Sequence, residues 1–239
     1  MQLLIEAKGL TKKFKDREVV KGIDLEVQKG EVLALIGTNG AGKSTTLSML
    51  LGILKPDGGL VSRWKENFKA FTGVQLQSTP FFEGYTAEEN LELFSALYNR
   101  KLSKAAIQNI LDECGLREAK KTPAVRLSLG QQKRLAIAVT TVHNPELVIL
   151  DEPTAGLDPR ARHEIRNMIN QLAEKGVTVV FSSHDMEEVA RIADRIILMH
   201  EGRIVADGTP ENLLEIHDAE NLEELYLQLT ESVLLEESI

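Results

Sequence analysis

Residues 37–45 read GTNGAGKST, a loop with three glycines, a lysine and hydroxyl side chains. The apolar run EVLALI (31–36) precedes the loop, and the helical pattern TTLSMLLGIL (45–54) overlaps its end. The spacing fits G-x-x-x-x-G-K-S, in which glycines let main-chain N–H groups turn toward phosphates at a helix N-terminus. We therefore predict a phosphate-binding loop. The alternative is a glycine-rich turn that caps a helix by chance.

Within this loop, Lys43 is expected to reach the β- and γ-phosphates of a nucleotide, and Ser44 to ligate Mg²⁺. The residues predicted to bind the nucleotide are Gly37, Thr38, Asn39, Gly40, Ala41, Gly42, Lys43, Ser44, Thr45 and Thr46.

A second functional element is ELVILDEP (146–153), an apolar strand that ends in Asp151 and Glu152. A carboxylate at the C-terminal end of a parallel strand lies at the crevice where ligands bind in such sheets. Asp151 is then placed to bind Mg²⁺ through water, and Glu152 to orient or deprotonate an attacking water. The alternative is an acidic pair that caps a helix beginning at Pro153.

The architecture predicted from the rest of the chain is α/β. Apolar β-branched runs alternate with helical patterns, as expected for a parallel sheet covered on both faces; the runs are 31–36, 146–150, 177–182 and 195–199. Before them, LLIEAKGL (3–10) and REVVKGIDLEV (17–27) predict shorter strands, broken by Gly9 and Gly22, in an antiparallel β layer.

The strand pattern disappears between residues 86 and 142, where apolar residues recur at helical spacing in three segments, 86–98, 103–116 and 128–142. Thr86 with Glu89 forms a capping box, and Gly115 is placed to end the second helix. Segment 56–77 reads as one strand fragment followed by a helix over 64–71, with Trp64, Phe68 and Phe71 on one face.

These segments predict a single domain of 1–239 with an inserted helical subdomain. The expected parts are a catalytic core of 1–77 and 143–208, the helical subdomain 78–142 and a C-terminal helical tail 209–239.

Composition narrows the class of protein. The chain has 28 Lys and Arg against 36 Asp and Glu, a net charge of -8, which argues against a broad nucleic-acid surface. We interpret the basic stripe Lys8 to Lys15 as a solvated face. No apolar run approaches the length of a membrane span, and the first residues lack a signal-peptide pattern, so a cytoplasmic location is expected. The single cysteine, Cys114, excludes an internal disulfide.

Five motifs in order resemble those of the nucleotide-binding subunit of an ATP-binding cassette (ABC) transporter, most similar to bacterial exporter-type cassettes. They are Walker A (37–45), Walker B (147–152), the signature LSLGQQ (127–132), the D-loop AGLD (155–158) and the switch histidine His184 in SSHDMEE. The resemblance covers nearly the whole chain. It implies a P-loop NTPase core with a mixed sheet, an ATPase activity, and ATP and Mg²⁺ as cofactors.

The resemblance also assigns roles to single residues. Lys43, Glu152 and His184 are the implied catalytic residues, with His184 touching the γ-phosphate. Phe14 falls where an aromatic ring stacks on adenine; the alternative is a core phenylalanine. Gln77 falls at the glutamine that contacts Mg²⁺ and senses the membrane partner, with Gln75 as the alternative register.

The implied partners are a second cassette and transmembrane permease subunits. Ser128, Gly130 and Gln131 would cap the γ-phosphate of ATP bound to the opposite subunit, which is a second copy or a paralogous cassette, and Asp158 would lie at the interface. ATP would then join two chains head to tail. The chain would be peripheral on the inner face of the membrane, and the cargo would be chosen by the permease.

Three departures from the family pattern affect these expectations. Leu129 replaces a glycine of the signature and is expected to crowd the opposite nucleotide or demand a different backbone angle, which would weaken closure. Thr38 stands where proline is usual, a mild change, and segment 56–77 is shorter than usual. The alternatives that remain are a soluble, non-transport ABC ATPase and a nucleotide switch with weak hydrolysis.

Overall fold

The computed structural model describes residues 2–76 and 80–236, and it divides into two compact units. Unit 1 comprises Met1–Glu66 and Thr178–Ile239, and unit 2 comprises Asn67–Val177. The elements of unit 1 are β1 (Leu3–Phe14), β2 (Arg17–Gln28), β3 (Val32–Ile36), α1 (Lys43–Leu50), β4 (Gly58–Arg63), β7 (Thr178–Ser183), α6 (Met186–Val189), β8 (Arg195–His200), β9 (Arg203–Gly208), α7 (Pro210–His217) and α8 (Leu222–Glu236). Those of unit 2 are η1 (Phe68–Phe71), β5 (Thr72–Gln75), α2 (Ala87–Leu97), α3 (Lys104–Glu113), η2 (Ala124–Arg126), α4 (Leu129–Thr141), β6 (Leu147–Asp151) and α5 (Pro159–Glu174).

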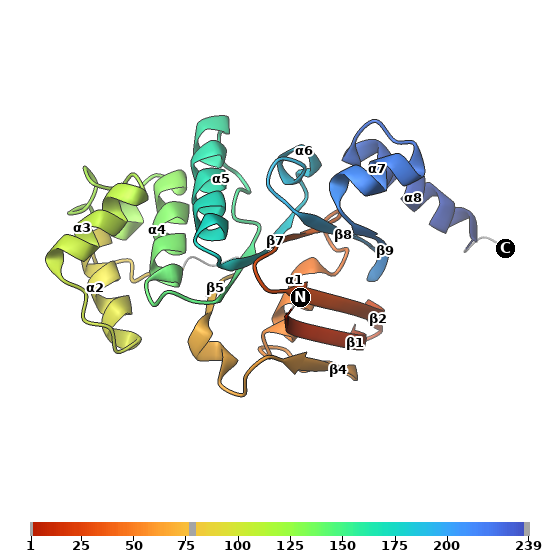
Figure 1. Ribbon diagram of the computed structural model, residues 1–239, viewed down its shortest axis with the longest axis horizontal. Helices are drawn as coiled ribbons and strands as arrows, with labels where there is room; N and C mark the ends of the chain where they lie inside the picture. The colour runs from red at the N-terminus through yellow and green to blue at the C-terminus, as the bar shows by residue number, and fades with distance from the viewer. Residues whose placement is uncertain (1, 77–79, 237–239) are drawn as a thin grey trace. The chain divides into compact units, whose positions relative to one another are not determined.

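The first sheet of unit 1 is antiparallel, in the order β2-β1-β4 (Figure 1). It confirms the predicted antiparallel layer. The expectation that Gly9 and Gly22 break the strands was wrong, because β1 and β2 each run for 12 residues through these glycines. Both glycines have positive φ, and the register shifts between Ala7 and Leu10. A β-bulge of this kind absorbs an extra residue without ending the strand.

The second sheet of unit 1 carries the glycine loop. β3 pairs in parallel with β7 on one side and β8 on the other, while β8 and β9 form an antiparallel hairpin. All five side chains of β3 are buried, as expected for a central strand covered on both faces. This mixed sheet confirms the predicted α/β class. α7 and α8 follow β9 and lie side by side in Figure 1.

Unit 2 is mostly helical. β5 and β6 pair in parallel, and α2, α3 and α4 are grouped in Figure 1. The predicted capping box is present, because Thr86 and Glu89 exchange hydrogen bonds between side chain and main chain. Gly115 takes a φ of 63° directly after the last turn of α3, as predicted for a residue that ends a helix.

The helix expected over 64–71 is not formed. Only Phe68–Phe71 is helical, as one 3₁₀ turn, and β5 begins at Thr72. Thr72 donates from its side chain to the main-chain oxygen of Phe68, and strand pairing with β6 starts at the same residue. A strand of unit 2 therefore overrides the local helical spacing.

No helix in the described part of the chain has the length and apolar composition needed to cross a bilayer.

Cys114 at the end of α3 should be inert in the folded protein. Burial raises the pKa of its thiol to about 12, so thiolate is scarce at neutral pH. We expect negligible labelling by a thiol reagent at pH 8, and one thiol per chain after unfolding in guanidinium. Because the unfolded thiol has a pKa of about 8.5, the stability from the neutral thiol is complete below that pH and is lost as pH rises toward 12.

Labelling of native protein at the rate of free cysteine would contradict this prediction. The control is Cys114→Ala, which should remove both the labelling and this part of the alkaline loss of stability.

Candidate functional site

The glycine loop of unit 1 joins β3 to α1, and two of its positions can be occupied only by glycine. Gly37 has a φ of 151° and Gly42 a φ of 105°. A Cβ atom would lie 2.2 Å from the main-chain oxygen of Met199 at Gly37, and 2.8 Å from that of Val19 at Gly42. The positive φ angles and the lack of room for a Cβ atom together explain why glycine stands at these two positions. A glycine-rich turn that capped a helix by chance would not require glycine at both.

Lys43 is folded back over this loop. Its side chain is buried, and Nζ donates to the main-chain oxygens of Gly37 at 2.7 Å and Thr38 at 3.2 Å. A buried ammonium needs acceptors, and these two carbonyls supply them. Phosphate oxygens are stronger acceptors, so Lys43 is placed to exchange carbonyl bonds for phosphate bonds.

Ser44 and Thr45 are half-buried in the first turn of α1, and Thr46 is fully buried. The hydroxyl of Thr46 has no hydrogen-bond partner among the described residues.

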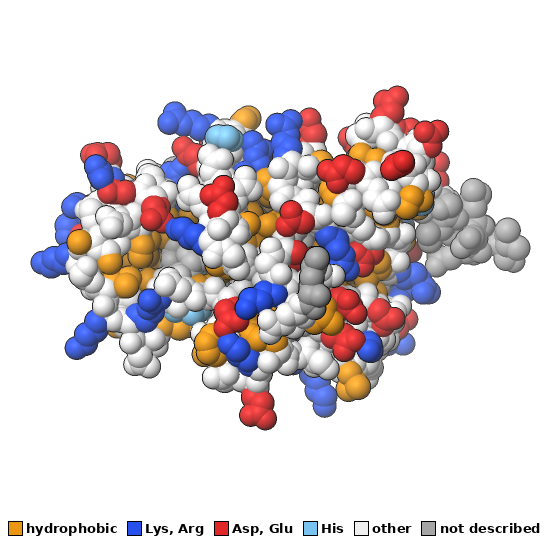
Figure 2. Space-filling model, in the orientation of Figure 1, with side chains coloured by type: hydrophobic (Ala, Val, Ile, Leu, Met, Phe, Trp, Pro, Cys, Tyr) orange, Lys and Arg blue, Asp and Glu red, His pale blue; other side chains and the backbone are white. Residues whose placement is uncertain are grey.

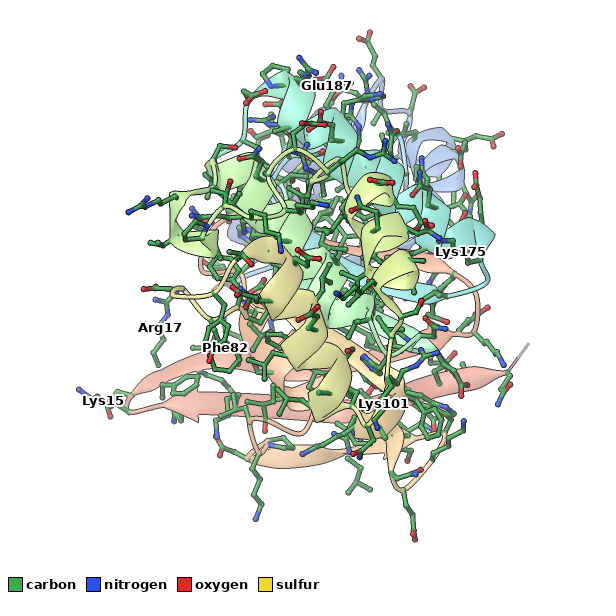
Figure 3. All side chains as sticks on the ribbon, turned by 90° about the vertical axis from the view of Figure 1, so that its left-hand side faces the viewer. Lys15, Arg17, Phe82, Lys101, Lys175 and Glu187 are labelled. Atoms are coloured by element: carbon green, nitrogen blue, oxygen red, sulfur yellow. The ribbon has the colours of Figure 1, made fainter. Side chains whose placement is uncertain are left out.

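A hollow of about 460 Å³ lies beside the loop in unit 1. Its lining comes from the β1–β2 turn and the start of β2, from the glycine loop, and from the end of β8 with the turn after it. The lining residues are Asp16, Arg17, Glu18, Val19, Lys21, Thr38, Asn39, Gly40, Ala41, His200 and Glu201. Figure 3 labels Arg17, which is the first residue of β2, directly after the β1–β2 turn. Its guanidinium lies 3.5 Å from the position of a Cβ built on Gly40. Arg17 was not predicted from the sequence, where its only signal was a cation at the start of a strand near the N-terminus.

Phe14 is the last residue of β1, and the β1–β2 turn that follows it lines the hollow. Its side chain is 47% exposed, so the alternative of a core phenylalanine was wrong. Lys12 Nζ lies 5.6 Å from the centre of the ring. An exposed aromatic ring offers a stacking surface, and its role with adenine stays a prediction.

The two carboxylates of unit 2 lie at the end of β6, as predicted. Asp151 is the last strand residue and is buried, while Glu152 has a φ of 50°. A glutamate in the left-handed region is strained, and such residues cluster at functional sites.

Lys133 of α4 lies beside these carboxylates. Its Nζ donates to the main-chain oxygen of Glu152 at 3.2 Å. Burial lowers the pKa of Lys133, and the charges of Asp151 and Glu152 oppose that shift. Lys133 was not predicted from the sequence, although a lysine on the apolar face of a predicted helix indicates a buried charge that needs a partner.

Replacement of Lys133 by Met should slow ATP turnover by about tenfold, because the Glu152 carbonyl loses a charged donor that helps to hold its strained backbone. Steady-state phosphate release measures the effect. Lys133→Arg, which keeps the charge and donors, is the control and should retain more activity than Met. A Met variant with parental turnover would contradict the role.

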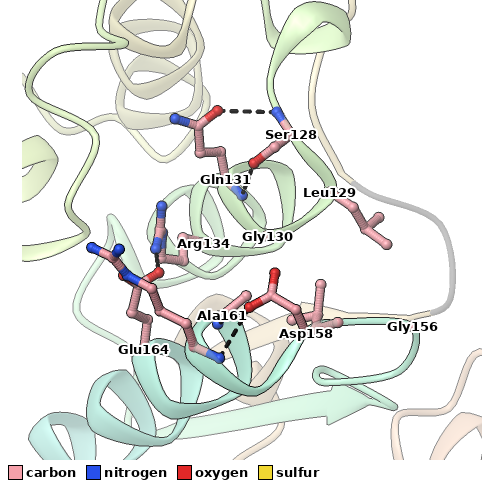
Figure 4. A pocket seen from close by; sticks show the side chains of 11 residues that line it. Ser128, Leu129, Gly130, Gln131, Arg134, Gly156, Asp158, Ala161 and Glu164 are labelled. Atoms are coloured by element: carbon pink, nitrogen blue, oxygen red, sulfur yellow. Dashed lines mark hydrogen bonds and ion pairs between the residues drawn. The ribbon is translucent and has the colours of Figure 1, made fainter.

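The signature residues and Asp158 line a second hollow, of about 310 Å³, within unit 2 (Figure 4). Ser128 caps α4: its hydroxyl accepts from Gln131 N at 3.3 Å, and its N donates to Gln131 Oε1 at 3.0 Å. Asp158 caps α5, and its Oδ1 accepts from Arg160 N and Ala161 N, each at 3.0 Å. A Cβ at Gly130 would lie 2.9 Å from that of Ala161, so glycine is required there. Their roles toward a second subunit stay predictions.

Leu129 does not distort the signature loop. It is the first residue of α4, and no positive φ is needed there. The expected special backbone angle is therefore absent. Its side chain is 48% exposed and lies beside Gly156, where an added Cβ would be 3.5 Å from Leu129 Cδ2. The effect on an opposite nucleotide stays a prediction.

Two further predicted site residues are His184 and Gln77. His184 is exposed directly after β7 in unit 1. Gln77 lies outside the described residues. Gln75, the alternative register, ends β5 and is fully buried, and neither its amide nitrogen nor its oxygen has a partner among the described residues.

The geometry of the glycine loop defines a P-loop nucleotide-binding protein, and comparisons identify its family. The family model "ABC transporter" matches residues 20–155. The bacitracin transport ATP-binding protein BcrA of Enterococcus faecalis is 38% identical over 225 residues, covering 91% of this chain and 72% of that protein. The lantibiotic transport ATP-binding protein SrtF of Streptococcus pyogenes is 33% identical, covering 93% of this chain and 96% of that protein.

A longer relative and a solved structure indicate the same family. The probable multidrug ABC transporter ATP-binding protein YbhF of Escherichia coli (strain K12) is 38% identical over 221 residues, which cover 89% of this chain but 38% of that protein. The chain thus spans less than half the length of YbhF. A structure described as the ATP binding subunit of an ABC transporter superposes with a TM-score of 0.83 at 30% identity, covering 95% of this chain and 99% of that one.

The chain belongs to the ABC transporter family. The ATP-binding subunits of this family are ATPases, and the resemblance found in the sequence is confirmed.

Proposed function

We propose that the chain is the ATP-hydrolysing subunit that powers an exporter through ATP-driven, head-to-tail dimerisation. The observation that carries the proposal is the loop of 37–45, in which glycine geometry and the buried Lys43 leave a preformed phosphate cradle. The exporter assignment is supported by relatives named for bacitracin transport and Nod factor export.

Mg²⁺ fits the donor set of the chain. Ser44 offers a hydroxyl at the start of α1 and Asp151 a buried carboxylate at the end of β6, both oxygen ligands of the kind that Mg²⁺ prefers. The ion would neutralise charge on the β- and γ-phosphates when it is bound. Glu152 would accept a proton from the attacking water, His184 would contact the γ-phosphate, and Gln77 would contact the ion.

The second subunit would complete each site. Ser128, Gly130 and Gln131 lie at the N-terminus of α4, which carries a partial positive charge suited to a γ-phosphate. Asp158 would lie at the same interface. ATP would contact both subunits only in the closed dimer, so its binding would stabilise the dimer. Hydrolysis would remove these contacts and let the two subunits separate.

A permease contact is supported by exposed aromatic residues near α2. Hydrophobic side chains reach the surface around α2 and α3 (Figure 2), and Figure 3 shows Phe82 just before α2. Phe82 and Tyr85 are each nearly half exposed and pack edge to face, with ring centres 6.0 Å apart. Aromatic residues are enriched in protein interfaces. Such docking would hold the chain at the inner face of the membrane.

Light scattering of Glu152→Gln with and without Mg-ATP tests the proposal. We expect a monomer without nucleotide and a dimer with Mg-ATP. The matched control adds Ser128→Asp, because aspartate still caps α4 but its charge repels a γ-phosphate from the opposite subunit. The double variant should bind ATP and stay monomeric. A Glu152→Gln chain that binds ATP and remains a monomer would contradict ATP-driven dimerisation.

A further inference from the structure

The C-terminal helix α8 contacts the nucleotide loop through Tyr226. The Tyr226 side chain is buried, and its hydroxyl lies 3.1 Å from Thr38 Oγ1 and 3.0 Å from His200 Nδ1. The rings of Tyr226 and His200 also meet edge to face, with centres 5.9 Å apart. All three residues belong to unit 1, although Thr38 and Tyr226 are 188 residues apart in sequence.

The hydroxyl of Tyr226 satisfies both neighbours at once. A phenol donates one hydrogen bond and accepts another, so it donates to one of the two partners and accepts from the other, in either tautomer of His200. His200 Nε2 is buried without a partner among the described residues, so Nδ1 makes the only hydrogen bond described for this ring. A phenylalanine at 226 would fill the same space and lose both bonds.

Thr38 is also held through its main chain. Its carbonyl oxygen accepts from Lys43 Nζ at 3.2 Å and from Ala41 N at 3.2 Å. A proline at this position would have its φ fixed by the ring, whereas the φ of threonine is free to vary unless contacts hold it. The bond from Tyr226 therefore fixes the residue whose carbonyl Lys43 uses.

We propose that Tyr226 is a positioning residue for the nucleotide loop, which α8 holds in its binding conformation through the hydroxyl of Thr38. The inference rests on the proposed assignment of 37–45 as the nucleotide site. Loss of the bond lets Thr38 sample other conformations, and the nucleotide must then order the loop when it binds, which costs affinity. Tyr226 touches no substrate and acts only through Thr38.

Equilibrium binding of Mg-ADP by titration calorimetry tests the inference in the parent chain, in Tyr226→Phe, in Thr38→Val and in the double variant. We expect each single change to raise Kd by about three- to tenfold, the range of one hydrogen bond. The double variant should bind no more weakly than the weaker single variant, because both changes remove the same bond. Tyr98→Phe, a change of the same kind in unit 2, should leave Kd unchanged.

The other outcomes contradict either the role of Tyr226 or the proposed nucleotide site. Tyr226→Phe with parental Kd but a lowered melting temperature would reduce Tyr226 to a packing residue and overturn the inference. Fully additive effects in the double variant would also overturn it. A parent chain that binds no ADP would overturn the proposed nucleotide site itself. If Tyr226→Phe does not fold, Thr38→Val alone tests the bond from its other end, and a parental Kd there would overturn the inference.

Discussion

Glu152→Gln lowers steady-state ATP turnover by about two to four orders of magnitude and leaves Mg-ATP binding within threefold of the parent, the result expected when a general base is removed. Glutamine keeps the size of the side chain and an oxygen but cannot take the proton of water at neutral pH. The bond from Lys133 to the main chain of residue 152 does not depend on the side chain and should persist.

Phosphate release and nucleotide binding are measured on the same samples. Glu174→Gln at the exposed end of α5 is the control and should have parental turnover. Turnover of Glu152→Gln within a factor of about three of the parent would show that another group activates the water.

Lys43→Ala abolishes measurable ATP binding. Lys43 makes two charged hydrogen bonds to loop carbonyls. Loss of two corresponding bonds to phosphate would lower the affinity for ATP by about hundredfold or more. Titration calorimetry with Mg-ATP measures the change. Alanine removes the ammonium without adding bulk inside the glycine loop.

The fold of this variant is checked by circular dichroism, and Lys69→Ala, an exposed lysine of η1, is the control for loss of one positive charge. Normal affinity in Lys43→Ala would refute the assignment of the loop.

The local parts of the site were predictable from sequence because they depend on neighbours along the chain. The glycine spacing of 37–42 fixes the turn that a strand and a helix enclose, and Ser128 caps the helix that follows it. The α/β class followed from continuous apolar runs such as 31–36, which is fully buried as β3.

The errors in the predicted strands and helix have a common cause. Gly9 was expected to end a strand, but its N–H donates to Asp24 on the neighbouring strand and the bulge continues the pairing. The apolar spacing of 64–71 favours a helix, yet Gly73 packs so closely against α4 that an added Cβ would lie 2.5 Å from Thr140 O. Sheet pairing and close packing decide these segments, and neither is local.

Contacts between distant residues were beyond sequence reasoning for the same reason. Nothing near Thr38 indicates that a tyrosine 188 residues later will bind its hydroxyl. Lys133 is likewise separated by 19 residues from the carbonyl that it contacts. Propensity and spacing describe helices and strands but not which side chains meet across them.

The left-handed backbone of Glu152 places stability and activity in opposition. Glycine adopts this conformation without the penalty of about 1 kcal/mol that a residue with a Cβ pays. A laboratory selection for heat resistance alone would therefore favour glycine at this position and discard the carboxylate. Thermostable variants of this chain have to be screened for turnover at each round, because the position most easily relaxed is the one proposed to activate the water.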